Sequence, residues 1–204
     1  QDGHGFMNKQ IAITQRVQVV EQTGERRDAL SQEWAVFAET CGFCPVILPN
    51  HLPAVERILS QTPLDGILLT GGNDLSAYGG DAPERDEVEE FLIAQSIQKK
   101  LPLLGVCRGM QMLLSFFGTP LQRISGHIRV DHPLDNGDIV NSYHGWGATT
   151  CPPPLYPRAW GLDGVLEAVG HQEYPWIHGI MWHPERYFPP RPRDVRWMKE
   201  VFAL

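Results

Sequence analysis

A cysteine flanked by glycines is the residue best placed to do chemistry in this sequence. Cys107 stands at the centre of GVCRG, residues 105–109, between a short apolar run and a segment of helical period. A G-x-C-x-G pattern in that place predicts a nucleophile elbow, a sharp strand-to-helix turn that exposes the thiol at a sheet edge. Both glycines are expected for steric reasons, because side chains do not fit such a turn. The alternative is a buried structural cysteine beside two packing glycines.

Backbone amides near this cysteine are expected to stabilise an oxyanion. The N-terminus of the helix that follows Cys107 favours a thiolate, and the backbone N–H of Arg108 is predicted to donate to a developing negative charge. A second donor is predicted at Gly72, in a glycine pair that ends a buried strand and lets backbone amides approach a ligand. A tight turn that needs positive φ is the alternative for this pair.

A thiolate nucleophile needs a base, and the segment WHPE at residues 182–185 supplies one. In an extended chain His183 and Glu185 project to the same side, so Glu185 can hold the imidazole in the tautomer that serves Cys107. Pro184 restrains the backbone between them. The spacing therefore predicts a catalytic triad of Cys107, His183 and Glu185.

Short apolar runs alternate with longer segments of helical period, which predicts an α/β fold with a mostly parallel sheet. Strands are expected at residues 10–14, 45–48, 65–70 and 101–106, and helices at residues 25–40, 52–60, 87–99, 108–117 and 194–202. Strand-like segments without intervening helices, at residues 126–130, 138–140, 165–169 and 177–182, predict an antiparallel extension. Stiff proline-rich loops are expected at residues 151–154 and 188–192. Arg16, Gly72 and Cys107 then all follow strand carboxyl ends, where α/β folds bind ligands.

Composition favours a single domain that acts on small molecules. Of the 204 residues 42% are hydrophobic, and 24 Asp and Glu against 17 Lys and Arg give a net charge of −7. This acidic balance argues against nucleic acid or an anionic membrane as the main partner. One domain is expected over residues 7–204, behind a short expression remnant at residues 1–6. No apolar run is long enough to span a membrane, and four cysteines without a secretion signal predict a cytoplasmic location.

Together these motifs resemble the class I glutamine amidotransferases over essentially residues 7–204. The resemblance implies a flavodoxin-like three-layer sandwich and a Cys-His-Glu triad in the chain order found here. It also implies residues that bind the α-amino and α-carboxylate groups of a γ-glutamyl substrate: Gly71, Asn73, Gln111, Asn141, Ser142, Tyr143 and His144. Ser142 and Tyr143 are expected to act mostly through backbone groups.

Within that superfamily the chain resembles the γ-glutamyl hydrolase branch, peptidase family C26. A closer resemblance, to hydrolases of γ-glutamyl-CDP-amidate, is carried by ITQR at 13–16, LTGGNDL at 69–75, GHI at 126–128 and VNSYH at 140–144. It implies a freestanding enzyme of bacterial surface-polysaccharide phosphoramidate synthesis that releases glutamate and cytidine diphosphoramidate. The reaction passes through a glutamyl thioester and is expected to need no metal or organic cofactor.

Other functions stay open at this point, as does the oligomeric state. A glutaminase subunit would deliver ammonia to a separately encoded synthetase, and a γ-glutamyl-γ-aminobutyrate hydrolase would differ in its leaving group. A non-catalytic binding module would have no need of all three triad residues. The proline- and arginine-rich residues 186–196 depart from the family pattern and bear on the shape of the leaving-group pocket.

Arginines near the predicted site have a functional interpretation, whereas others do not. Arg16 follows a strand and Arg186 follows the triad carboxylate, so either is a candidate to bind a phosphate on the leaving group. Arg26, Arg27 and Arg85 lie among acidic residues and are interpreted as solvated ion pairs of little energetic weight.

One cysteine pair has the C-x-x-C spacing of metal and redox sites. Cys41 and Cys44 are interpreted as structural thiols, because no further zinc ligands stand at matched spacing. A redox pair would open a helix, whereas this pair is expected to follow one.

Overall fold

The structure, a computed structural model, describes residues 8–204. The expected expression remnant at residues 1–6 lies outside the described residues. The helices of the described chain are α1 (Glu33–Cys41), α2 (Leu52–Gln61), α3 (Pro83–Lys99), α4 (Arg108–Phe116) and α5 (Pro192–Phe202), with 3-10 turns η1 (Ser76–Tyr78) and η2 (Pro184–Arg186). Its strands are β1 (Gln10–Ile13), β2 (Arg16–Val19), β3 (Arg26–Ala29), β4 (Cys44–Ile47), β5 (Gly66–Leu69), β6 (Leu103–Val106), β7 (Gln122–Arg123), β8 (Ile128–Pro133), β9 (Ile139–Tyr143), β10 (Trp146–Gly147), β11 (Leu155–Trp160), β12 (Leu166–His171) and β13 (Ile177–Ile180).

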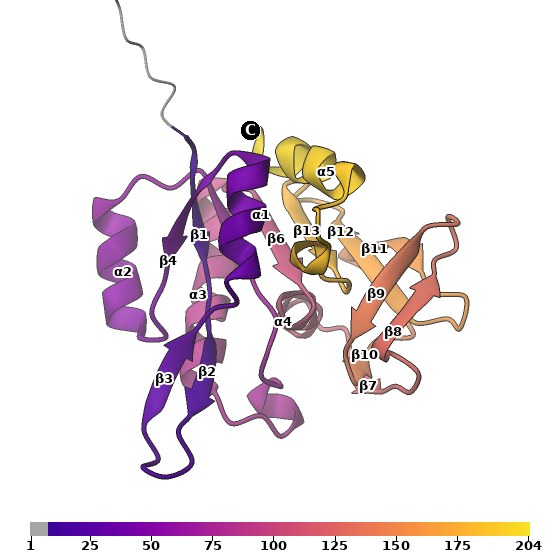
Figure 1. Ribbon diagram of the computed structural model, residues 1–204, viewed down its shortest axis with the longest axis horizontal. Coiled ribbons are helices and arrows are strands. Elements are labelled where there is room, and N and C mark those ends of the chain that lie inside the picture. The colour runs from indigo at the N-terminus through magenta and orange to yellow at the C-terminus, as the bar shows by residue number, and fades with distance from the viewer. Residues whose placement is uncertain (1–7) are drawn as a thin grey trace, which may run out of the picture.

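A seven-stranded sheet runs through the molecule in the order β11-β12-β13-β6-β5-β1-β4 (Figure 1). Strands β4, β1, β5, β6 and β13 are parallel, and β12 and β11 continue the sheet antiparallel. The residues of β5 and β6 are all buried, as expected for central strands covered on both faces. The structure thus confirms the predicted α/β fold with a mostly parallel sheet and an antiparallel extension.

Helices cover both faces of this sheet, which gives the three-layer sandwich. Ile67 and Leu69 of β5 belong to one apolar core together with Leu92 of α3. Leu68, whose side chain points to the opposite face, belongs to a second core together with Phe202 of α5. Packing on both faces fixes β5 and β6 side by side, so the loops that follow them are held next to each other.

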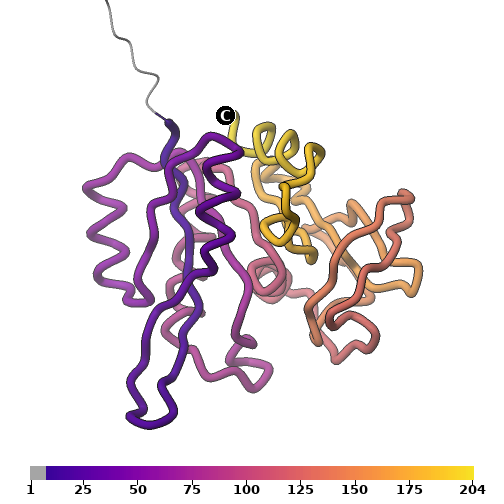
Figure 2. The backbone as a smooth tube through the Cα atoms, in the orientation of Figure 1, coloured from indigo at the N-terminus to yellow at the C-terminus, as the bar shows by residue number. Residues whose placement is uncertain are grey.

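The predicted helix over residues 25–40 is wrong in its first half. Residues 16–29 contain the antiparallel hairpin of β2 and β3, with Gly24 in its turn at φ 70°. The helix begins only at Glu33, because the apolar period is limited to the residues buried in α1. As predicted, it ends at Gly42, which takes the left-handed conformation. The hairpin extends past the carboxyl ends of the parallel strands (Figure 2), and Arg16 lies at its base, paired with Ala29.

The expected antiparallel extension is correct only in part. Residues 166–171 form β12, which is antiparallel to its neighbours, whereas β13 runs parallel to β6. The predicted strands near residues 128 and 139 are β8 and β9, which pair with each other in a separate two-stranded sheet. Strand β11 is not predicted by the sequence, since the prolines around it indicate a loop. It lies at the edge of the sheet, where Pro157 is tolerated because the missing N–H has no inner partner.

The cysteines agree with the structural interpretation of the C-x-x-C pair. All four cysteines lie within the described residues and are free thiols. Cys41 is buried at the end of α1, and burial raises the pKa of its thiol to about 12, which makes it a poor nucleophile. Among residues 8–204 no helix has the length and apolar character needed to cross a membrane.

Candidate active site

The backbone around Cys107 forms the strained turn that its flanking glycines predict. Cys107 lies between β6 and α4 with φ 55° and ψ −105°, a conformation rare for a residue with a side chain. A Cβ atom on Gly105 would lie 2.5 Å from the carbonyl oxygen of Gly109. A Cβ atom on Gly109 would strike the backbone of Leu69 in β5. Glycine is therefore required at both positions, and Cys107 is held at the carboxyl end of the sheet.

His183 and Glu185 form the expected pair beside this cysteine. The Nδ1 atom of His183 lies 3.0 Å from Glu185 Oε2, and both side chains are buried. His183 is extended at φ −105° and ψ 95°, and Glu185 lies in the 3-10 turn that Pro184 begins. A Cβ atom on Gly71 would lie 3.6 Å from Cys107 Cβ and 3.7 Å from His183 Nε2, so Cys107 and His183 lie next to the same glycine. The structure thus brings the three predicted triad residues together.

Asn141 holds the backbone of His183 in place. Its side-chain oxygen accepts a 2.8 Å hydrogen bond from the His183 N–H, and its side-chain nitrogen donates to the His183 carbonyl at 2.9 Å. Its own N–H donates to the hydroxyl of Tyr187. The Asn141 side chain thus positions His183, and the expected role of Asn141 in substrate binding stays a prediction.

Neighbouring charges keep a proton on His183. Burial alone lowers the pKa of this imidazole, but the charge of Cys107 and hydrogen bonds to Cys107 and Glu185 outweigh it and raise the pKa to about 10. A negative charge on Cys107 therefore favours the protonated form of His183. An imidazolium next to a cysteine stabilises the thiolate, which is the reactive form of that side chain.

The glycine loop after β5 passes directly beside the triad. A Cβ atom on Gly71 would lie 2.9 Å from Cε1 of His183, and one on Gly72 would strike the guanidinium of Arg16. Gly72 has φ 90° and Asn73 has φ 61°, so the alternative of a turn with positive φ is correct and compatible with a donor role. The Asn73 side chain exchanges hydrogen bonds with the backbone of Val17, and so anchors the β2–β3 hairpin to the loop.

Arg85 of α3 holds this glycine loop in place. The interpretation of Arg85 from sequence as part of a solvated ion pair is therefore wrong. Its side chain is fully buried in α3. The guanidinium donates to the carbonyl oxygens of Thr70 at 2.7 Å, Gly71 at 3.0 Å and Gly72 at 2.5 Å. Its Nε atom also donates to Glu89 Oε1 at 3.2 Å. Burial lowers the pKa of Arg85 to about 10, with Glu89 opposing the shift, so the group stays charged at neutral pH.

Glu89 links the two backbone segments predicted to bind the oxyanion. Besides Arg85, it forms a buried ion pair with Arg108, whose guanidinium also pairs with Asp86. Arg85 holds the Gly72 loop, and Arg108 carries the other predicted donor on its backbone. One buried carboxylate thus joins both halves through charged hydrogen bonds. Arg85 and Glu89 are four residues apart, so they share one face of α3 with its buried apolar residues. This helical spacing is the sequence signal that could have predicted the burial of both side chains.

A cavity of about 320 Å³, the Cys107 cavity, opens on the thiol. Of the predicted substrate residues it contains Arg16, Gly72, Asn73, Arg108, Gln111, Tyr143 and His144. Gln111 donates from its side chain to the carbonyl of Trp146 at 3.1 Å. Ser142 does not line this cavity, since its hydroxyl lies 3.2 Å from Nδ1 of the buried His127.

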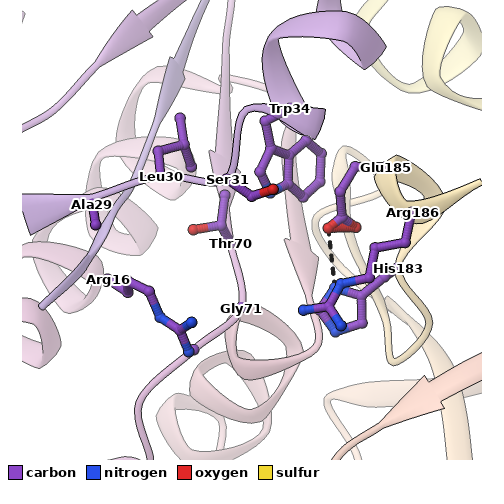
Figure 3. A pocket seen from close by; sticks show the side chains of 11 residues that line it. Arg16, Ala29, Leu30, Ser31, Trp34, Thr70, Gly71, His183, Glu185 and Arg186 are labelled. Atoms are coloured by element: carbon purple, nitrogen blue, oxygen red, sulfur yellow. Dashed lines mark hydrogen bonds and ion pairs between the residues drawn. The ribbon is translucent and has the colours of Figure 1, made fainter. Parts of the chain in front are cut away.

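A narrower cavity of about 50 Å³, the His183 cavity, is lined by the imidazole and shares Arg16 and Gly72 with the first. It is also lined by Ser31, Trp34, Gly71 and Glu185. The guanidinium groups of Arg16 and Arg186 approach it from opposite sides (Figure 3). The guanidinium carbon of Arg186 lies 4.2 Å from the ring centre of Tyr143, which limits its freedom. Ser31 and Trp34 carry no motif that predicts this position.

Segment 186–196 positions Arg186 and packs against β9. The hydroxyl of Tyr187 accepts a hydrogen bond from the backbone of Asn141, and Arg191 stacks on Tyr187 at 4.1 Å from the ring centre. Arg191 also donates to the carbonyl of Ile139 and pairs with Asp194 at the start of α5. Of this segment, Arg186 lines the His183 cavity.

Comparison with known proteins agrees with this geometry. The Peptidase C26 family model matches residues 10–136 and 131–185. A γ-glutamyl-CDP-amidate hydrolase of Campylobacter jejuni is 30% identical over 201 residues, which cover 95% of this chain and 98% of that protein. A γ-glutamyl-γ-aminobutyrate hydrolase of Escherichia coli O157:H7 is 28% identical, over 79% of this chain and 80% of that protein.

A solved structure shows the same fold. A GMP synthase-type protein of Thermoplasma acidophilum superposes with a TM-score of 0.70 at 17% identity, over 96% of this chain and 93% of that one. The family match spans Cys107, His183 and Glu185, and both sequence relatives are hydrolases of γ-glutamyl compounds by name. The chain therefore belongs to the Peptidase C26 family and is a hydrolase of amide C–N bonds.

Proposed function

We propose that this enzyme releases glutamate from a γ-glutamyl amide whose leaving group carries phosphate, in the manner of γ-glutamyl-CDP-amidate. The products are then glutamate and cytidine diphosphoramidate, within bacterial surface-polysaccharide phosphoramidate synthesis. The observation that carries this proposal is the pair of cavities at the triad, one lined by Cys107 and the other by His183, Arg16 and Arg186. The similarity to the C. jejuni enzyme over nearly the whole chain supports it.

The reaction begins with attack of the Cys107 thiolate on the γ-carbonyl carbon. The carbonyl π electrons move to oxygen, and the backbone N–H groups of Gly72 and Arg108 stabilise the oxyanion. His183 gives its proton to the amide nitrogen as the C–N bond breaks, which leaves a glutamyl thioester on Cys107. Glu185 keeps the imidazole oriented throughout.

Hydrolysis of the thioester uses the same groups in reverse. Acylation removes the negative charge from Cys107, which is a main cause of the raised His183 pKa. The imidazole can therefore stay neutral after giving up its proton, and it then acts as general base toward water. Water adds to the thioester carbonyl, the C–S bond breaks, and the thiolate and glutamate are formed. His183 regains its proton in this step.

The leaving group is assigned to the His183 cavity. The proton on His183 must reach the departing nitrogen, so that nitrogen lies on the side of the imidazole. A phosphate bound to this nitrogen then lies between Arg16 and Arg186, and guanidinium groups match phosphate oxygens in charge and geometry. The free state of the four cysteines suits the reducing cytoplasm, where nucleotide substrates are made.

A substrate panel tests the proposal. Released glutamate is measured with γ-glutamyl-CDP-amidate, glutamine and γ-glutamyl-γ-aminobutyrate, for the unaltered chain and for Cys107→Ala. We expect the highest kcat/KM with the nucleotide substrate and loss of all activity in Cys107→Ala. Preference for glutamine or for the aminobutyrate compound would reject the phosphate assignment, and undiminished turnover by Cys107→Ala would reject the mechanism.

A further inference from the structure

Three histidines surround a buried glutamate behind the Cys107 cavity. Glu167 lies on β12 and is fully buried, and His127 precedes β8. His132 lies on β8, and His144 follows β9. The β8–β9 hairpin thus places three imidazoles around one carboxylate of the central sheet.

Three imidazole nitrogens lie close to one oxygen of this glutamate. Glu167 Oε1 lies 3.2 Å from His127 Nδ1, 3.6 Å from His132 Nε2 and 3.5 Å from His144 Nε2. Neither oxygen of Glu167 and neither of the Nε2 atoms of His132 and His144 has a hydrogen-bond partner in residues 8–204. A buried carboxylate without compensation costs several kcal/mol, so this cluster needs a positive charge, from a bound cation or from protonated imidazoles.

The contacts of the other ring nitrogens show which imidazole nitrogens near Glu167 carry no proton in the neutral rings. His144 Nδ1 lies 3.0 Å from the carbonyl oxygen of Trp146, which can only accept, so the proton of a neutral ring is on Nδ1. His127 Nε2 lies 2.6 Å from Asp163 Oδ2 and donates to it by the same reasoning. His132 Nδ1 is 3.4 Å from the carbonyl of Pro133. Neutral rings therefore direct acceptor lone pairs, not N–H groups, at Glu167.

This arrangement is the one that protein ligands adopt around a divalent transition metal. Tetrahedral N and O ligands at about 2.0–2.1 Å from zinc are about 3.3 Å apart, close to the separations in this cluster. The ligand atoms of His127, His132 and Glu167 all lie within 4.8 Å of one another. The bond from His127 to Asp163 is the carboxylate–histidine contact that orients metal-binding imidazoles.

We propose that His127, His132 and Glu167 bind one zinc-type divalent ion, with His144 Nε2 on the remaining side of the same carboxylate. The ion takes no part in the thioester chemistry, because none of these three ligands lines the Cys107 cavity. Its role is structural: it fixes the β8–β9 hairpin on the central sheet. Ser142, whose hydroxyl contacts His127, and the neighbouring Tyr143 are positioned in consequence.

Protons are the competing source of positive charge. Glu167, ahead of Asp163, raises the pKa of His127, so a protonated His127 could pair with the carboxylate in place of a metal. The two alternatives differ in stoichiometric metal binding, which needs no catalytic assay. This inference stands apart from the proposed function, so either can fail alone.

The test uses the full chain after removal of metals by a chelator. Zn²⁺ binding is measured by calorimetry, and Co²⁺ is used as a spectroscopic probe of the ligands. We compare the unaltered chain with His132→Ala, and with His51→Ala as a matched control, since His51 is exposed and far from this cluster in sequence. His132 is partly exposed, so its replacement is tolerated better than that of Glu167.

We expect one equivalent of Zn²⁺, and an intense tetrahedral Co²⁺ spectrum without a thiolate charge-transfer band. Saturation at about 100 times the Kd should raise Tm by about 5 °C or more. His132→Ala should weaken binding by more than about 10-fold, and His51→Ala should leave it unchanged. Absence of binding to the unaltered chain, a thiolate band, or equal affinity in His132→Ala would each overturn the proposal. If His132→Ala fails to fold, the Co²⁺ spectrum of the unaltered chain still tests the proposed metal site.

Discussion

Replacement of Arg85 by lysine tests whether the buried charges under the glycine loop set the rate. Arg85 donates to three successive carbonyls, those of Thr70, Gly71 and Gly72. Lysine keeps the charge but lacks the planar fork, so it cannot hold all three carbonyls at once. Each lost charged hydrogen bond is worth about 1.5–3 kcal/mol, and loss of two corresponds to about 3–6 kcal/mol divided between stability and loop position.

The expected kinetic effect follows from the position of Gly72. Loss of one well-placed oxyanion donor costs about 2.7–4 kcal/mol in the transition state, or about 10²–10³ in kcat. We therefore predict that Arg85→Lys lowers kcat by about 10²-fold and changes KM far less. The affinity for a glutamyl aldehyde, which forms a tetrahedral adduct with the thiol, should fall in parallel with kcat.

An exposed arginine on the same side of the molecule provides the control. Arg26 pairs with Glu84 of α3 at 2.6 Å, and both side chains are partly accessible to water. Arg26→Lys should change the free energy of unfolding by no more than about 0.5 kcal/mol and leave kcat unchanged. A folded Arg85→Lys enzyme with normal kcat and normal aldehyde affinity would refute the positioning role of Arg85, whatever its Tm.

Four further predictions concern the triad and the leaving group. Gly71→Ala places a methyl group 2.9 Å from the His183 ring and should lower kcat by about 10²-fold in steady-state assays, since small displacements of catalytic groups have effects of that size. Arg16→Ala should raise KM for a phosphorylated γ-glutamyl amide about 10-fold or more and leave glutamine turnover nearly unchanged; equal effects on both substrates would contradict the leaving-group assignment. The raised pKa of His183 predicts that acylation of Cys107 declines as pH rises toward about 10, where the imidazolium loses its proton. In Cys107→Ser the thiolate charge is gone, so an NMR titration should find the His183 pKa lower, and an unchanged value would show that Cys107 is not its cause.

The reactive centre is predictable from sequence because its constraints are local. A cysteine between Gly105 and Gly109 needs both glycines for backbone contacts within one turn and its neighbouring strand. The two-residue spacing of His183 and Glu185 likewise brings them together without any distant element. The alternation of strands and helices is sufficient to predict the three layers of the fold, because central parallel strands are apolar on both faces.

Contacts between distant segments are not predictable in the same way. Arg85 stands among acidic residues, which is typical of a solvated helix, and only the fold reveals that it lies under the loop after β5. Asn141 is expected from the sequence to meet a ligand, but its side chain meets the backbone of a residue 42 positions later. The β2–β3 hairpin escapes prediction because its alternating charged residues bury little surface and depend on pairing across a turn.

The central claim is that Cys107 forms a glutamyl thioester during turnover. Rapid acid quench of the enzyme with its γ-glutamyl substrate, followed by peptide mass spectrometry, tests it most directly. The account predicts a glutamyl adduct on the peptide that carries Cys107, formed and consumed at rates compatible with kcat. Turnover without any adduct on that peptide, or an adduct on Cys41, Cys44 or Cys151 in its place, would contradict it.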